Sequence, residues 1–208
     1  MSSTRCRTVF ISGSAYEYGR FGDTGKTFVR DLTQSLVKNG FKIVSGFGSG
    51  VGNYILEGAL QEIYPEKKGR LNDHLGIYPF PIQADGWTDT RAGFLETIWE
   101  NYRNDIISQA GIAIFLFGNK LEDITVREAD GMLKEFQIAR SHQALLIPVG
   151  ASGYTSEKLW KNIVEQYDDY FENREHFGLY EQLGDPGTEP EDLIDVILQI
   201  ATSKNLVQ

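Results

Sequence analysis

The sequence predicts an α/β fold: a single doubly wound, Rossmann-like domain with a mainly parallel sheet of about five strands or more, covering residues 1–208. Short apolar runs alternate along the chain with longer amphipathic segments, as in a sheet whose strands are joined by helices. One run, Gly111 to Gly118, is apolar throughout its interior, which is typical of a parallel strand covered on both faces. No internal repeat or linker-like segment divides the chain, so we expect one domain.

Five short segments are expected to be strands because they are apolar, and most of them end in glycine, serine or proline. In chain order they are residues 7–14, 41–46, 75–81, 111–118 and 144–150. The segment from Phe21 to Asn39 predicts a helix, since its apolar residues follow helical spacing and Asn39 and Gly40 form a typical C-terminal cap. The other expected helices are 51–64, 90–110, 129–142, 156–171 and 190–203, and the polar segments 65–73, 119–127 and 172–189 are expected to be loops or irregular.

The composition limits the classes of function. A net charge of −9 and a pI of about 4.9 argue against a nucleic-acid partner, because binding to a phosphate backbone requires a basic face. The single cysteine, Cys6, allows no internal disulfide and suits a reducing, cytoplasmic environment. One cysteine and three scattered histidines do not indicate a zinc site. Neither a membrane-length apolar stretch nor a signal peptide is present, so no membrane association is predicted.

The strongest candidate for a ligand site follows the expected strand 41–46. Four glycines stand at alternate positions, Gly46, Gly48, Gly50 and Gly52, and a helical pattern begins directly after them. A strand, a glycine turn and a helix present backbone N–H groups and a positive helix end to a phosphate. Glycine allows the phosphate to approach closely and the turn to adopt positive φ, and a larger side chain at Gly50 would exclude the phosphate. The alternative is a tight turn that requires glycines only for its own packing.

A second strand end lies beside this turn in the expected topology. Strand 7–14 also ends in small residues, Gly13, Ser14 and Ala15, and ligands of doubly wound sheets bind beyond the carboxyl ends of the strands. The glycine spacing matches neither a Rossmann dinucleotide motif nor a Walker loop, and no Lys-Ser/Thr pair follows the glycines. The pattern therefore favours a nucleotide-type ligand and does not support ATP hydrolysis.

Charged side chains near the same edge are candidates for ligand contact. Lys120 follows strand 111–118, Arg91 and Arg103 lie on helix 90–110, and Glu135 lies early in helix 129–142. A cation at this edge would meet phosphate, and a carboxylate would accept hydrogen bonds from ribose hydroxyls or an adenine amine. The alternatives are solvated surface cations and, for Glu135, simple complementation of the helix dipole. Glu135 and Arg103 could also assist cleavage of an N-glycosidic bond, although nothing in the sequence requires it.

Several of these segments together resemble the SLOG superfamily and, within it, the C-terminal sensor domain of Thoeris antiphage effectors. The resemblance rests on Ile11 to Ala15, Gly46 to Gly52, Arg103, Phe117 to Lys120 and Gly131 to Glu135, and it extends over nearly the whole chain. In that family the domain binds a cyclic ADP-ribose isomer made by a TIR-domain partner. Binding reorganises an oligomer and activates a separate sirtuin-like domain that destroys NAD.

The resemblance implies that this chain is a sensor and not an enzyme, because it contains no sirtuin-like domain. It also implies no cofactor, a homodimer or homotetramer, and phosphate contacts from Arg103 and Lys120 with a ribose or base contact from Glu135. The full set of expected ligand-binding residues is Gly13, Ser14, Ala15, Gly46, Phe47, Gly48, Ser49, Gly50, Val51, Gly52, Phe80, Arg91, Arg103, Gly118, Asn119, Lys120, Gly131 and Glu135.

The superfamily also contains LOG-type phosphoribohydrolases, whose loop resembles Pro-Gly-Gly-x-Gly-Thr-x-x-Glu. Between Gly118 and Glu135 this chain lacks the double glycine and the threonine. A nucleoside-monophosphate phosphoribohydrolase that uses Glu135 and Arg103 is therefore kept as the alternative function.

Overall fold

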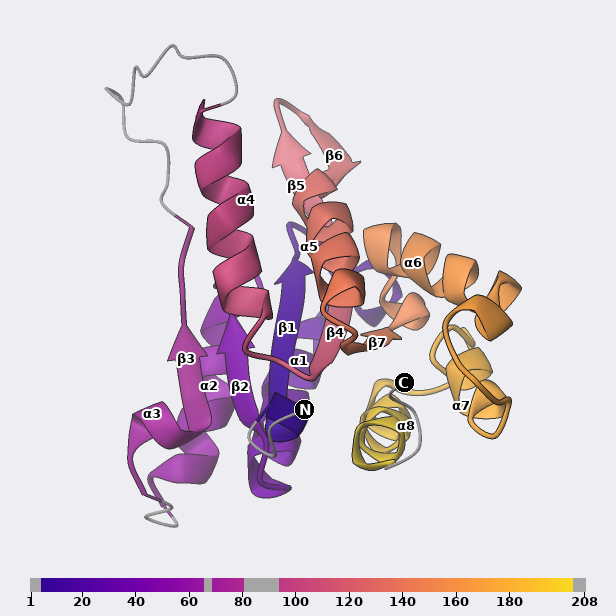
Figure 1. The fold of residues 1–208 in the computed structure, drawn as a ribbon, viewed down its shortest axis with the longest axis horizontal. Helices are drawn as coiled ribbons and strands as arrows, with labels where there is room; N and C mark the ends of the chain where they lie inside the picture. Colours follow the sequence, from indigo (N-terminus) through magenta and orange to yellow (C-terminus); the bar gives the residue numbers. More distant parts are fainter. Residues whose placement is uncertain (1–4, 66–68, 81–93, 204–208) are drawn as a thin grey trace.

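A five-stranded parallel sheet forms the centre of the computed structural model, which describes residues 5–65, 69–80 and 94–203 (Figure 1). The strand order is β3-β2-β1-β4-β7, and every neighbouring pair is parallel. The strands are β1 (Thr8–Ser14), β2 (Lys42–Ser45), β3 (Leu75–Ile77), β4 (Ile112–Phe117) and β7 (Leu145–Pro148). The chain adds strands outward from β1 on one side and then returns to its other side with β4. This order confirms the doubly wound α/β fold and places its switch point between β1 and β4.

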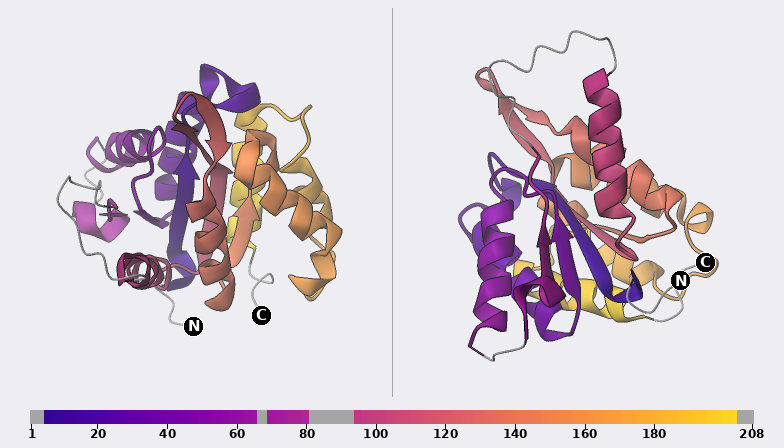
Figure 2. Two further views of the ribbon diagram at one scale, coloured as in Figure 1. Left: turned by 90° about the horizontal axis from the view of Figure 1, so that it is seen from above. Right: turned by 60° about the vertical axis from the view of Figure 1, so that its left-hand side comes forward.

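Helices cover both faces of the sheet (Figure 2). Helix α1 packs against α2 and α8 on one face, and α4 packs against α5 on the other, where α5 also contacts β1 and β4. The helices are α1 (Thr24–Lys38), α2 (Gly52–Ile63), α3 (Leu71–His74), α4 (Phe94–Ile107), α5 (Asp130–Ser141), α6 (Tyr154–Glu165), α7 (Phe177–Gln182) and α8 (Pro190–Thr202). Short 3₁₀ turns occupy Arg5–Arg7, Gly19–Phe21, Gly150–Ser152 and Tyr167–Asp169.

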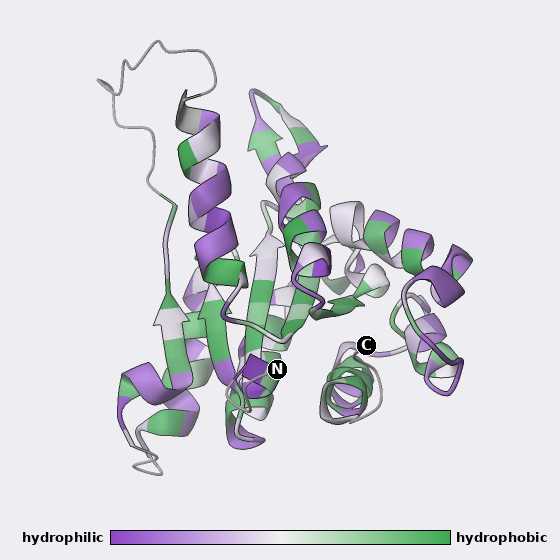
Figure 3. Cartoon of the chain, viewed as in Figure 1, coloured by the Kyte–Doolittle hydropathy of each residue, from purple (hydrophilic) through white to green (hydrophobic). Residues whose placement is uncertain are grey.

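The core lies between these layers. All six residues of β4 are buried, which explains their uninterrupted apolar sequence (Figure 3). Helix α1 buries Phe28, Leu32 and Leu36 along one face, as its spacing predicts. Each such side chain contributes roughly 1.5–3 kcal/mol when it leaves water. The strands are therefore held rigidly, and with them the positions of the residues at their ends.

The prediction that residues 119–127 form a loop is wrong, because most of this segment forms an antiparallel hairpin. It consists of β5 (Asn119–Glu122) and β6 (Thr125–Glu128), joined through Asp123, which has a φ of 57°. Only Asn119 of its eight strand residues is buried. Because neither face of the hairpin is covered by the core, its sequence lacks the apolar alternation from which a strand is predicted.

Other boundaries differ by smaller amounts. Helices α3 and α7 lie within segments expected to be loops or irregular, and both are too short to show helical periodicity. Helix α6 begins at Tyr154 and ends at Glu165, before the expected end at 171. Strand β3 ends at Ile77, and residues 81–93, which include the expected start of helix 90–110, lie outside the described residues.

The glycine segment packs directly on the end of β1. A Cβ at Gly48 would lie 1.9 Å from the carbonyl oxygen of Gly13, and one at Gly50 would lie 1.8 Å from that of Ala15. Gly50 also has a φ of 72°, and the N–H of Ala15 donates to the carbonyl of Ser49 at 2.8 Å. These two glycines are therefore required by the contact between two loops. The missing Cβ of Gly50 faces protein backbone, so packing alone accounts for this glycine, and its expected contact with a phosphate stays a prediction.

Replacing Gly50 with alanine or valine should therefore destabilise the protein in the absence of any ligand. We expect a loss of roughly 2–4 kcal/mol in the free energy of unfolding, from overpacking and from the left-handed backbone. Gly178→Ala is the matched control, since a Cβ there meets nothing within 4 Å, and within helix α7 it should be neutral or stabilise by up to about 1 kcal/mol. Urea unfolding of the ligand-free variants measures both effects. Wild-type stability in Gly50→Ala would contradict the packing described here.

Candidate functional site

Three side chains from three different elements meet beside the switch point of the sheet. They are Ser12 of β1, Arg103 of α4 and Glu135 of α5. The hydroxyl of Ser12 donates to Oε2 of Glu135 at 2.5 Å, and Nε of Arg103 lies 3.6 Å from Oε1 of the same carboxyl. The side chains of Arg103 and Glu135 are only 18% and 13% exposed. The structure thus brings together the arginine and the carboxylate that were predicted to be functional.

The carboxyl of Glu135 is held in an unfavourable environment for a charge. Burial raises the pKa of Glu135 above its usual value, while the hydrogen bond from Ser12 and the charge of Arg103 oppose that rise only in part. Nε of Arg103 is itself buried and has no hydrogen-bond partner among the described residues, so its attraction to Glu135 acts across 3.6 Å without a hydrogen bond. Both groups therefore retain hydrogen-bonding capacity that a ligand could use.

An aromatic cluster supports Arg103. Its guanidinium carbon lies 4.8 Å from the centre of the Phe80 ring, in a cation–π contact. Phe80 in turn packs edge-on against Tyr102, with ring centres 5.1 Å apart. A Cβ at Gly46 would lie 2.8 Å from Cε2 of Phe80, so this glycine makes room for the ring. Phe80 was among the expected ligand-binding residues, and in the structure its ring contacts the arginine.

The first turn of α5 lies next to Arg103 and near Lys120. A Cβ at Gly131 would lie 3.4 Å from Nη2 of Arg103, which places the guanidinium against the start of the helix. Nζ of Lys120, on the hairpin, is 3.9 Å from Oδ2 of Asp130, the first residue of α5. The first N–H groups of a helix have no acceptor within it and attract anions. The two predicted cations thus approach the same helix end, although the Lys120 side chain is 44% exposed and pairs weakly.

Several of the expected ligand-binding residues use their backbone N–H groups for hydrogen bonds within the protein, and their contact with a ligand stays a prediction. The two strand-end loops pack on each other, and the strand ends continue their hydrogen bonding into the turns. The donors and acceptors are Ala15 to Ser49 O, Phe47 to Ser45 Oγ, Val51 and Gly52 to Gly48 O, and Gly118 to Ser14 O.

Asn119 is likewise occupied by the protein. Its side chain accepts hydrogen bonds from the N–H groups of Tyr16 and Glu17, at 2.9 and 3.1 Å, and donates to the carbonyl of Glu17 at 2.8 Å. Asn119 is 1% exposed. Its amide therefore fastens the loop after β1 to the end of β4, and the neighbouring Gly118 is required because a Cβ would lie 2.7 Å from Cβ of Thr155.

Two features of the strand ends remain unexplained by packing alone. The hydroxyl of Ser14 is buried and has no hydrogen-bond partner in the described part of the chain. A buried polar group without a partner costs about 1–3 kcal/mol. Phe47 has a φ of 58°, a backbone conformation that is costly for a residue other than glycine.

Arg91, also expected at the site, lies outside the described residues.

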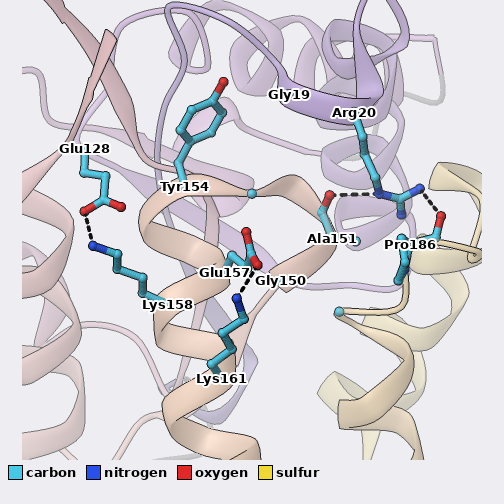
Figure 4. A pocket seen from close by; sticks show the side chains of 12 residues that line it. Gly19, Arg20, Glu128, Gly150, Ala151, Tyr154, Glu157, Lys158, Lys161 and Pro186 are labelled. Atoms are coloured by element: carbon cyan, nitrogen blue, oxygen red, sulfur yellow. Dashed lines mark hydrogen bonds and ion pairs between the residues drawn. The ribbon is translucent and has the colours of Figure 1, made fainter.

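A separate hollow of about 590 Å³ lies beside α6 (Figure 4). Its cations already have partners: Lys158 bonds Glu128 at 2.7 Å, Lys161 bonds Glu157 at 2.6 Å, and Nε of Arg20 donates to the carbonyl of Ala151 at 2.9 Å. None of the residues predicted to bind a ligand lines it. We therefore place the candidate site at the Ser12, Arg103 and Glu135 cluster.

The comparison with known families assigns the chain to one of them. Residues 1–204 match the profile of STALD, described as the Sir2- and TIR-associating SLOG family. The chain belongs to the STALD family. Curated relatives named NAD(+) hydrolase ThsA are 38% identical over 203 residues in Cytobacillus dafuensis, 39% over 205 in Acinetobacter baumannii (strain 532279) and 33% over 201 in Bacillus cereus (strain MSX-D12). These matches cover 93–95% of this chain but only 40–41% of each relative.

Ser12 is the member of the candidate site that sequence reasoning missed. The available signal was its position: Ser12 follows Val9, Phe10 and Ile11 within a buried strand and is 3% exposed, so its hydroxyl needs a buried partner. Within the described residues, no helix of the STALD chain is both long and apolar enough to span a bilayer. No group of three or more His, Cys, Asp or Glu side chains in that part is placed to hold a metal.

The raised pKa of Glu135 predicts a specific pH dependence of stability. The folded state favours the protonated carboxyl, so the contribution of Glu135 is fully present below its unfolded pKa and is lost as the pH rises through its folded pKa. Relative to Glu135→Gln, the wild-type free energy of unfolding should therefore fall with rising pH across that interval. Denaturant unfolding of both ligand-free proteins over a pH series measures the difference.

Glu96→Gln provides a control of opposite sign. Lys134 lowers the pKa of the exposed Glu96, so this residue contributes stability above its unfolded pKa and loses it as the pH falls. If the difference between wild type and Glu135→Gln does not change with pH, or rises with it, the buried charge described here is wrong.

Proposed function

We propose that this STALD chain is the ligand-sensing part of a Thoeris antiphage effector and binds a cyclic ADP-ribose isomer made by a TIR-domain partner. The observation that carries the proposal is the buried pair of Arg103 and Glu135 at the start of α5, beside the switch point of the sheet. The family description, which names Sir2 and TIR association, supports the same proposal.

The chemistry of the cluster suits the two parts of such a ligand. A diphosphate would meet Arg103, the first N–H groups of α5 and, from the hairpin, Lys120. A ribose hydroxyl would donate to the Glu135 carboxylate, and the unpaired hydroxyl of Ser14 would gain a partner. Charge-assisted hydrogen bonds contribute roughly 1.5–3 kcal/mol each, so a few of them account for selective binding.

In this proposal the chain itself has no catalytic activity and requires no cofactor. NAD hydrolysis, named for the relatives, would belong to the part of those proteins outside the matched 40–41%. The ligand would act by preferring one arrangement of a cytoplasmic homodimer or homotetramer, because a ligand shifts an equilibrium only by its difference in affinity for the two states.

One observation favours a second function. A carboxyl with a raised pKa also serves as the general acid in enzymes that cleave glycosidic bonds, and Glu135 is such a carboxyl. The alternative is therefore a LOG-type phosphoribohydrolase that releases adenine from AMP. The missing glycines and threonine between Gly118 and Glu135 weigh against it.

Isothermal titration calorimetry with cyclic ADP-ribose isomers, linear ADP-ribose and AMP, followed by chromatography of the mixtures, separates these functions. We expect a cyclic isomer to bind without forming a product. Arg103→Ala and Glu135→Gln should each weaken binding at least about tenfold, the effect of losing about 1.4 kcal/mol.

Arg174→Ala is the matched control. Arg174 forms an ion pair with Asp168 at a distance of 2.7 Å, and this pair is not part of the site, so its loss should leave binding unchanged. Arg103→Ala also leaves Glu135 without its cation, so its binding is measured well below its melting temperature. Adenine released from AMP would establish the alternative function. Failure of every nucleotide to bind would exclude both.

A further inference from the structure

The Glu135 carboxyl is fixed by groups of unequal rigidity. Arg103 approaches it with a long side chain whose Nε lies 3.6 Å from Oε1 and has no hydrogen-bond partner among the described residues. Ser12 reaches it at 2.5 Å from the middle of β1, where the strand pairs with β4 on one side and Ser12 is opposite Phe115. Because β1 is a central strand of the sheet and the Ser12 side chain is short, its hydroxyl is held in place more firmly than the end of a long side chain on a helix or loop.

Stability alone does not explain this arrangement. A buried hydroxyl and a buried carboxyl together cost free energy, and replacing such a pair with apolar groups of similar shape is often neutral or stabilising. The contact between Ser12 and Glu135 therefore points to a use for an oriented carboxylate at this edge of the sheet.

We propose that Ser12 is a positioning residue for ligand binding: its hydroxyl holds Oε2 of Glu135, so that the carboxyl is presented to the ligand in one orientation and as an acceptor. The inference rests on the proposed function, in which Glu135 receives a hydrogen bond from the ligand. It adds the residue that keeps the Glu135 carboxyl oriented and able to accept that hydrogen bond.

Few charged groups act on Glu135. Strands β1, β4 and β7, which pack against α5, contain no charged residue. Of the charged side chains described on the neighbouring helices, Arg103 of α4 faces it, while Glu96 of α4 pairs with Lys134 and Lys158 of α6 pairs with Glu128. Arg140 of α5 lies over the ring of Tyr170. The protonation of Glu135 therefore depends mainly on its burial, Arg103 and Ser12.

Removing the Ser12 hydroxyl should consequently change the pH range of binding. The hydrogen bond from Ser12 lowers the pKa of Glu135, so Ser12→Ala should raise it further. A protonated Glu135 accepts hydrogen bonds less well. As the pH is lowered, the variant should therefore lose binding at a higher pH than the wild type does.

The experiment measures the dissociation constant of the cyclic ADP-ribose isomer that binds the wild-type chain, by calorimetry from about pH 5 to 9. Ser12→Ala should weaken binding about tenfold or more at the acidic end and much less at the alkaline end. Ser12→Thr, which keeps the hydroxyl, should restore the wild-type profile. Ser156→Ala is the matched control. Ser156 is buried like Ser12, but its hydroxyl donates to a backbone carbonyl, that of Phe115 at 2.7 Å, and not to Glu135. The pH profile of binding should therefore not shift in this variant.

A double-mutant cycle tests the coupling between the two residues. Glu135→Gln should remove most of the pH dependence, and adding Ser12→Ala to it should cost little more. NMR titration of the Glu135 side-chain carboxyl in the ligand-free proteins gives an independent readout, with a higher midpoint expected in Ser12→Ala even if Ser12→Thr does not fold.

An equal loss of affinity at every pH, an unchanged midpoint or additive effects in the cycle would overturn the role of Ser12 while leaving the proposed function in place. A wild-type chain that binds no cyclic ADP-ribose isomer would instead overturn the proposed function, and this inference with it.

Discussion

The buried carboxyl of Glu135 is the constraint on which the candidate site depends. Taking a carboxylate out of water costs free energy, and among the described residues the cost is offset by a short hydrogen bond from Ser12 and by the charge of Arg103 at 3.6 Å. An arrangement of this kind contributes little to stability. It does present an oriented carboxyl and an arginine whose Nε has no hydrogen-bond partner among the described residues, at the switch point of the sheet, where ligands of doubly wound folds bind.

The surrounding backbone is built to hold this cluster still. Gly48 and Gly50 allow the loop after β2 to lie directly on the loop after β1, and the buried amide of Asn119 ties the loop after β1 to the end of β4. These contacts use up many of the N–H groups that a glycine-rich sequence suggests are available for phosphate. In the proposed function, recognition of an anion would therefore depend more on side chains and on the start of α5 than on the glycine segment itself.

The sequence predicts the fold well because its core elements are periodic: the apolar residues of β4 and the apolar face of α1 reveal a covered strand and an amphipathic helix. It does not reveal the hairpin, whose residues, apart from Asn119, lie outside the core. Glu135 could be selected from its position early in the helix that begins at this edge, and Arg103 from the family resemblance, and the structure brings them together. Their contact with Ser12 and the role of Gly50 depend on distances between distant segments, which no local pattern encodes.

The crystal structure of the chain bound to a cyclic ADP-ribose isomer tests the central claim most directly. The account predicts phosphate oxygens within hydrogen-bonding distance of the Arg103 guanidinium at the start of α5, and a ribose hydroxyl on the Glu135 carboxylate. A ligand seated instead in the hollow beside α6, with the contacts among Ser12, Arg103 and Glu135 unchanged and not touching it, would contradict the account.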